Sequence, residues 1–268
     1  MRKQRGSGEQ GHRRRAARWG VALVVLGMLQ GCGGGGAKQS ADRGGTSRDS
    51  TVAGAQTPLP PGSSVDPGAK AIVAPTRLLF IGTSLTAGLG LPDPVEAWPG
   101  QIGHIADSLG YRVKIQNAGL SGETSAGALR RADWLLKDTS DVVVIETGAN
   151  DGLRGLSAAD LSQNLSGIVS KVRQRMPKAQ LVIVAMEAPP NMGAEYATAF
   201  RKVFPAVASA TKATLTPFLL DGVAGIATLN QADGIHPTKE GAAMAARTVW
   251  PMIRGVLDAL RPASPPKV

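Results

Sequence analysis

From about residue 71 onward, short apolar runs of β type alternate with longer segments of helical periodicity. We predict strands at residues 78–81, 113–116, 142–146, 181–185 and 214–219. We predict helices at residues 98–109, 125–136, 158–176, 196–210 and 238–260. Because parallel strands need a crossover connection, this alternation predicts an α/β fold, with a five-stranded parallel sheet and helices on both faces.

Residues 1–31 have the pattern of a bacterial export signal. A basic stretch precedes the apolar run at 21–29, which is shorter than the ~20 residues that a membrane-spanning helix needs. The following Leu29-Gln30-Gly31-Cys32 resembles the lipobox of bacterial lipoproteins, in which the cysteine is lipidated and becomes the mature N-terminus. Cys32 is the only cysteine, so no internal disulfide can form. The alternative is an ordinary signal peptide followed by an incidental cysteine.

A lipid on Cys32 would anchor the chain to a membrane. Gly33, directly after it, resembles the sorting signal for the outer membrane of Gram-negative cells. We therefore expect an exported lipoprotein that faces the periplasm or the cell exterior, with the outer membrane as its location. Residues 33–70 are rich in Gly, Ser, Ala, Pro and Thr, which predicts that segment 32–70 is a flexible tether and that the folded domain is 71–268.

The net charge of +10 is concentrated in the signal. Residues 1–31 carry seven Arg or Lys residues against Glu9, so +6 of the charge lies there and +4 in the rest of the chain. Aromatic residues make up 4% of the chain and do not alternate with basic ones. We therefore expect no nucleic-acid partner.

Ser84 is the candidate nucleophile. The predicted strand at 78–81 ends at Gly82, and Ser84 lies on the turn that follows. That turn belongs to the carboxyl edge of the sheet, where open α/β folds bind their ligands. A serine hydroxyl becomes reactive only when a base accepts its proton and a third group orients that base.

His236 is the candidate base. Of the three histidines, His12 lies in the signal and His104 in a predicted helix, where we expect a structural role. His236 lies between the last predicted strand and helix, and Asp233 is close enough to orient its ring. Alternatively, Asp233 only forms a turn and Pro237 only begins a helix. The expected folded domain has two histidines and no cysteine, which are too few ligands for an ordinary zinc site, so we expect no metal.

Gly119 and Asn150 follow two further predicted strands and are candidate oxyanion donors. Gly119 offers a backbone N–H, and Asn150 offers a side-chain amide. Ordinary turn chemistry at strand ends is the alternative for both. Asp151 is expected to be a turn or cap residue.

Together these residues resemble the four signature blocks of the SGNH (GDSL-type) hydrolases, in family order. The blocks are Gly82-Thr83-Ser84-Leu85, Gly119, Gly148-Ala149-Asn150-Asp151 and Asp233-Gly234-Ile235-His236-Pro237. The resemblance covers residues 76–260 and is strongest to the lysophospholipase, arylesterase and thioesterase I subgroup. It implies a flavodoxin-like three-layer α/β/α fold and a serine esterase that needs no cofactor.

By this resemblance, Ser84 would be the nucleophile, His236 the base and Asp233 the orienting carboxylate. The Ser84 N–H, the Gly119 N–H and the Asn150 side chain would form the oxyanion hole. Thr83 departs from the family, which usually has an aspartate there.

We expect an exported hydrolase of carboxylic esters, of arylesterase, lysophospholipase or acyl thioesterase type, acting on small-molecule or lipid esters through an acyl-Ser84 intermediate. Residues 187–193 resemble the variable loop beside the acyl pocket of this subgroup, where Met192 would line an apolar cleft; a plain connection is the alternative. Deacetylation of cell-wall or other glycans is a second candidate function. A non-catalytic binding or scaffold lipoprotein, suggested by Thr83, is a third.

Overall fold

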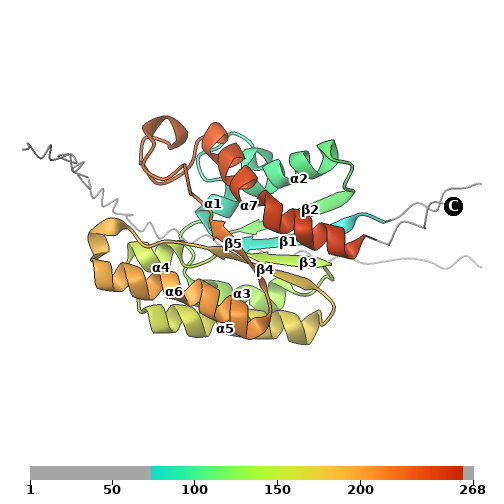
Figure 1. Cartoon of the computed structure of the whole chain (residues 1–268), viewed down its shortest axis with the longest axis horizontal. Coiled ribbons are helices and arrows are strands. Elements are labelled where there is room, and N and C mark those ends of the chain that lie inside the picture. The colour runs from blue at the N-terminus through green and yellow to red at the C-terminus, as the bar shows by residue number, and fades with distance from the viewer. Residues whose placement is uncertain (1–73, 262–268) are drawn as a thin grey trace, which may run out of the picture. The chain divides into compact units, whose positions relative to one another are not determined.

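The structure, a computed structural model, describes residues 74–261 (Figure 1). The expected signal at 1–31, the lipidated Cys32 and the whole of the tether at 33–70 lie outside the described residues. Within residues 74–261 no helix has the length and apolar character needed to cross a membrane.

The sheet has five parallel strands in the order β2-β1-β3-β4-β5. Their bounds are β1 Thr76–Gly82, β2 Val113–Gly119, β3 Val142–Ile145, β4 Gln180–Ala185 and β5 Thr214–Phe218. This is the flavodoxin-like order, which places a ligand crevice at the carboxyl ends of β1 and β3, where the direction of winding reverses. The predicted parallel sheet is confirmed.

Helices cover both faces of the sheet. Helix α2 (Trp98–Ser108) and helix α7 (Lys239–Leu260) lie together on one face, and the other face carries α3 (Ser125–Leu135), α5 (Ala158–Arg175) and α6 (Ala194–Thr211) (Figure 1). The short helices are α1 (Ser84–Ala87), α4 (Ala149–Leu153) and the 3₁₀ turns η1 (Pro94–Glu96), η2 (Pro190–Met192) and η3 (Ala227–Leu229). The three-layer α/β/α architecture is therefore as expected.

Side-chain caps fix where several helices begin. Thr124 caps α3, Ser157 caps α5 and Thr238 caps α7, each by accepting a hydrogen bond from a backbone N–H of the first turn. The first N–H groups of a helix have no acceptor within the helix, and the capping side chain supplies one. Each cap contributes about 1 kcal/mol to stability. The loops before these helices thereby have defined end points.

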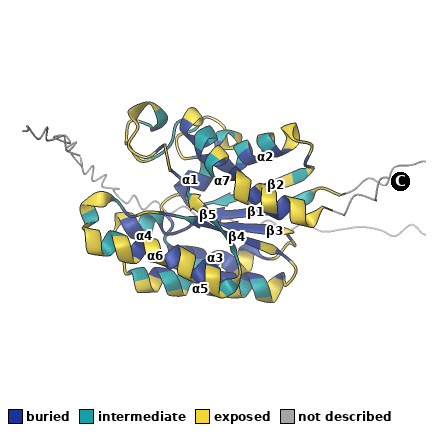
Figure 2. Ribbon diagram, viewed as in Figure 1, coloured by how far each residue is buried: buried dark blue, intermediate teal, exposed yellow. Residues whose placement is uncertain are grey.

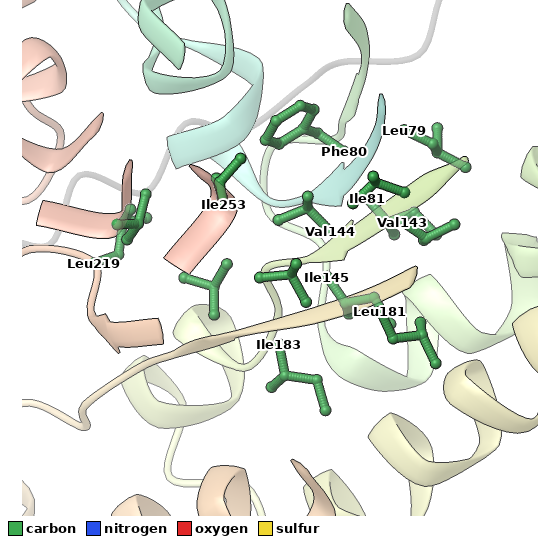
Figure 3. Packing of buried hydrophobic residues seen from close by; sticks show 14 of the residues in the cluster. Leu79, Phe80, Ile81, Val143, Val144, Ile145, Leu181, Ile183, Leu219 and Ile253 are labelled. Carbon is green, nitrogen blue, oxygen red and sulfur yellow. The ribbon is translucent and has the colours of Figure 1, made fainter. Parts of the chain in front are cut away.

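The core lies on both sides of the central strands, whose side chains are buried while the helices expose their outer faces (Figure 2). Phe80 of β1 packs edge-on against Trp98 of α2, with the ring centroids 5.0 Å apart. Figure 3 shows strand side chains and Ile253 of α7 within one apolar cluster. Because β1 and β3 are covered on both faces, their strand ends are held rigidly, which is what a catalytic edge requires.

Two of the predicted strands, at 78–81 and 113–116, are shorter than the observed ones. Strand β1 extends from Thr76 to Gly82, and β2 continues to Gly119. The residues at 117–119 are therefore the last ladder positions of β2, paired with the end of β1, and not a turn after it. This difference changes the interpretation of Gly119, as described below.

Candidate active site

Ser84 is the first residue of helix α1, directly after the end of β1. Thr83 is the N-cap of α1, and Gly88, with φ +77°, ends the helix after one turn. Ser84 is 8% exposed, so surrounding protein atoms cover most of it. At the first position of a helix its backbone N–H has no intrahelical acceptor and is left for another partner.

Ser84, His236 and Asp233 form one hydrogen-bonded chain. Ser84 Oγ lies 2.8 Å from His236 Nε2, and His236 Nδ1 lies 2.6 Å from Asp233 Oδ2. The partners are 152 residues apart along the chain, and the sheet brings them to one edge. With Asp233 accepting the Nδ1 proton, Nε2 is free to accept the proton of Ser84.

Asp233 also shapes the loop that carries the histidine. Its Oδ1 accepts the backbone N–H groups of Ile235 and His236, at 2.9 and 3.0 Å. Burial by itself raises the pKa of Asp233, but the hydrogen bonds from the His236 ring and from these N–H groups outweigh it, so the pKa is lowered overall. The group is therefore held as a carboxylate, the form that orients an imidazole.

Gln231 connects the histidine loop to the segment after the nucleophile. Its Nε2 donates to the carbonyl oxygens of Leu89 and Pro237, at 2.8 and 2.9 Å, and its backbone N–H donates to His236 O at 2.7 Å. Gly90, at φ +79°, lies so close that a Cβ there would be 2.0 Å from Gln231 Oε1. Sequence reasoning missed Gln231, because its partners are set by loop packing.

The expectation for Gly119 needs correction. Its N–H donates to Asn117 Oδ1 at 2.9 Å, so it is not free to bind an oxyanion. A Cβ at this position would lie 2.2 Å from the backbone N of Ala87. Gly119 is glycine because β2 passes against the nucleophile helix, which is a packing requirement.

Asn150 lies in α4, after β3, and reaches the turn that follows β2. Its Nδ2 donates one proton to Glu123 O at 3.0 Å, which leaves the second proton of the amide for another acceptor. Gly122, with φ +77°, is in the same turn, and its carbonyl accepts a bond from Arg154. Among the described residues, no acceptor for the Gly122 N–H lies within hydrogen-bonding distance.

Two buried acidic residues support this turn, and sequence analysis assigned neither to the site. Glu123 forms a bidentate salt bridge with Arg131, with Nε 2.6 Å from Oε1 and Nη2 2.7 Å from Oε2. Arg131 also donates to Ala118 O. Asp151 accepts the N–H and O–H of Ser125 at the start of α3. Asp151, expected to be a turn or cap residue, lies within α4, and its carboxylate binds the first residue of α3. The partners of both acids come from other elements, so no local pattern marks them.

Glu146, immediately after β3, is a third buried acid that sequence analysis missed. It accepts hydrogen bonds from the nucleophile turn, including the side chain of Thr83. Of the remaining expectations, His104 is exposed on α2 and contacts none of the catalytic groups, and Met192 lies half-buried in η2. Among residues 74–261 no group of three or more His, Cys, Asp or Glu side chains is placed to hold a metal ion.

A serine, a histidine and a carboxylate in sequential hydrogen bonds, at the carboxyl edge of a 2-1-3-4-5 sheet, define a serine hydrolase site on an α/β/α fold. Residues 80–244 match the model of the GDSL-like Lipase/Acylhydrolase family, and the chain belongs to that family. It is a serine ester hydrolase of the SGNH type.

Named relatives have ester substrates. The chain is 40% identical over 185 residues to Esterase TesA of Pseudomonas aeruginosa, covering 69% of this chain and 90% of that protein. It is 34% identical over 168 residues to an arylesterase of Vibrio mimicus, covering 62% and 82%. The crystal structure of the esterase EstA from Pseudoalteromonas, inhibited by monoethylphosphonate, superposes with a TM-score of 0.64 at 33% identity, covering 68% and 99%.

Proposed function

We propose that the protein hydrolyses carboxylic esters with an apolar acyl group through an acyl-Ser84 intermediate. This proposal rests on two hydrogen bonds, one between Ser84 Oγ and His236 Nε2 and one between His236 Nδ1 and Asp233. Ser84 Oγ attacks the ester carbonyl carbon while His236 accepts its proton. The tetrahedral intermediate collapses, His236 protonates the leaving alcohol, and the acyl group remains on Ser84. Water, deprotonated by His236, then releases the acid.

The developing oxyanion needs donors, and we propose the Ser84 N–H, the free amide proton of Asn150 and the Gly122 N–H. The Gly122 N–H takes the place expected for Gly119, because it lies in the turn that Asn150 binds and has no acceptor among the described residues. Removing one such donor costs on the order of 10²-fold in rate or more. We therefore expect Asn150→Ala to lower kcat by at least that factor.

Exposed apolar side chains on the loops of the catalytic edge support acyl esters over polar glycan acetates. Leu89 lies after α1, Leu120 directly after β2, and Ile235 in the histidine loop. Leu153 is the last residue of α4, and Leu156 follows that helix. Each is at least 40% exposed, so each is accessible to an apolar acyl group bound at this edge. Thioesters with the same acyl groups fit the same description.

The decisive experiment compares wild type with Ser84→Ala on p-nitrophenyl esters of short, medium and long acyl chains. We expect turnover by wild type that rises from acetyl to longer acyl groups, and loss of turnover in the variant. Undiminished turnover in Ser84→Ala would rule out the acyl-serine mechanism. Release of acetate from an acetylated polysaccharide, without cleavage of long-chain esters, would instead favour the glycan O-acetylesterase.

We further propose that the protein is exported and lipid-anchored through Cys32, facing the periplasm or the cell exterior. The support is the order of a basic stretch, a short apolar run and Leu29-Gln30-Gly31-Cys32. Cys32→Ser should give a mature form without the lipid, recovered in the soluble fraction. Recovery of wild-type protein in that same fraction, unlipidated, would refute the anchor.

A further inference from the structure

Glu146 is a buried carboxyl group that none of the reaction steps above uses. It follows β3, is 1% exposed, and faces the nucleophile turn. Its Oε2 accepts the Thr83 N–H at 2.8 Å and the Thr86 hydroxyl at 2.9 Å. The Thr83 hydroxyl lies 3.0 Å from each of its oxygens. Glu146 thus binds the residues on both sides of Ser84.

Both threonine hydroxyls also accept a hydrogen bond from an outer partner. Trp98 Nε1 lies 3.2 Å from Thr86 Oγ1, and an indole nitrogen can only donate. The backbone N–H of Leu85 donates in the same way to Thr83 Oγ1, at 3.4 Å. Each hydroxyl oxygen therefore accepts one bond from its outer partner and has its own proton available for the Glu146 carboxyl. Three donors converge on Glu146, which is the arrangement a carboxylate accepts.

The space around this network is filled. A Cβ on Gly82 would lie 2.0 Å from Thr86 Oγ1 and 2.8 Å from Glu146 Oε2, so the end of β1 contacts the network directly. Burial raises the pKa of Glu146, and the hydrogen bonds from Thr83 and Thr86 partly offset that rise. A buried carboxyl of this kind is costly for stability unless its partners hold it.

We propose that Glu146 is a positioning residue for the nucleophile, and that it acts through Thr83 and Thr86. By holding residues 83 and 86, Glu146 fixes the turn that places Ser84 Oγ 2.8 Å from His236 Nε2. Thr83 offers Glu146 both its N–H and its hydroxyl, whereas an aspartate there would bring a second acid against a buried one. The inference rests on the proposed acyl-serine function.

The test measures kcat and KM for p-nitrophenyl esters in Glu146→Gln, Thr83→Val and the double variant. Glu146→Gln keeps the shape but places an amide N–H₂ where a hydroxyl proton needs an acceptor, and Thr83→Val removes that hydroxyl while keeping the backbone N–H. We expect each single variant to lower kcat about 10-fold with KM within about two-fold, because displacing a reacting group mainly affects the chemical step. We expect the double variant to be no slower than the slower single variant, because both changes break one contact.

Tyr111→Phe is the matched control. It removes a hydrogen bond to Asp258 at 2.6 Å, before the amino end of β2 and so at the sheet edge opposite Ser84, and it should leave kcat unchanged while lowering stability. A kcat within about two-fold of wild type in both Glu146→Gln and Thr83→Val would overturn the inference, as would effects that multiply in the double variant. If Glu146→Gln does not fold, Thr83→Val decides alone. Activity that survives in Ser84→Ala would overturn the proposed function instead.

Discussion

Replacing Thr83 by aspartate should make the stability of this protein strongly dependent on pH. Thr83 Oγ1 lies 3.0 Å from both oxygens of Glu146, so an aspartate would bring two carboxyl groups within hydrogen-bonding distance in a buried site. Two like charges about 4 Å apart repel by about 4 kcal/mol at an effective dielectric constant of 20. The folded variant will therefore keep one proton on the pair over a range of pH in which the unfolded chain has lost both.

The sign follows from this retained proton. The second proton of the pair has a folded-state pKa raised above its unfolded value, so its contribution to stability is present at low pH and is lost as pH rises through the folded pKa. The wild type carries one buried carboxyl with a raised pKa, so at low pH both proteins are protonated there and differ little. At higher pH the destabilisation of Thr83→Asp grows by at most about 1.4 kcal/mol per pH unit, toward a ceiling of about 4 kcal/mol.

Urea unfolding at acidic, neutral and alkaline pH measures this effect. Thr83→Asn is the matched control, because it has the size of aspartate without the charge. The difference in unfolding free energy between Thr83→Asp and Thr83→Asn should grow with pH, and should grow less when Glu146 is replaced by glutamine, because burial alone then raises the pKa of the aspartate. A difference independent of pH in the wild-type background would show that the two side chains do not interact as described.

Three further changes test other parts of the site. Asp233→Asn should lower kcat by about 10²- to 10⁴-fold, because the ring of His236 loses its orienting carboxylate. The pKa of Asp233 is lowered in the folded state, so wild type loses some stability as pH falls below about 4. The variant should lack this pH-dependent part of the stability, as measured by urea unfolding against pH. Gln231→Ala frees the histidine loop and should lower kcat about 10-fold in steady-state assays, and an unchanged kcat would argue against its positioning role. Gly119→Ala should destabilise the folded protein by several kcal/mol in thermal or urea unfolding, because its Cβ meets the backbone of Ala87. The control is Gly255→Ala in α7, which has open space around it and should stabilise the protein by about 0.5–1 kcal/mol. Equal effects of the two substitutions would contradict the packing assigned to Gly119.

The sequence predicted the sheet and most of the site because both depend on local patterns. A continuous apolar run ending in glycine places Ser84 at a strand end, and such ends share one edge in any parallel sheet. The loop from Asp233 to His236 is short enough for spacing alone to suggest their contact. The candidate catalytic residues were therefore accessible from residue types, positions and the family resemblance.

Tertiary structure alone decided which groups surround that chain. Gly119 has the sequence position of an oxyanion donor. In the structure, however, β2 extends beyond the predicted end at residue 116 to include Gly119, whose N–H donates to Asn117 Oδ1. Thr83, unexplained by the sequence, has its partner 63 residues away in Glu146. Hydrogen bonds between elements depend on how the strand ends and loops are packed, and a buried acid is recognisable only when its donors are known. The sequence by itself determined the candidate nucleophile, its candidate base and the sheet that carries them, whereas only the folded structure determined how the turn that bears Ser84 is held.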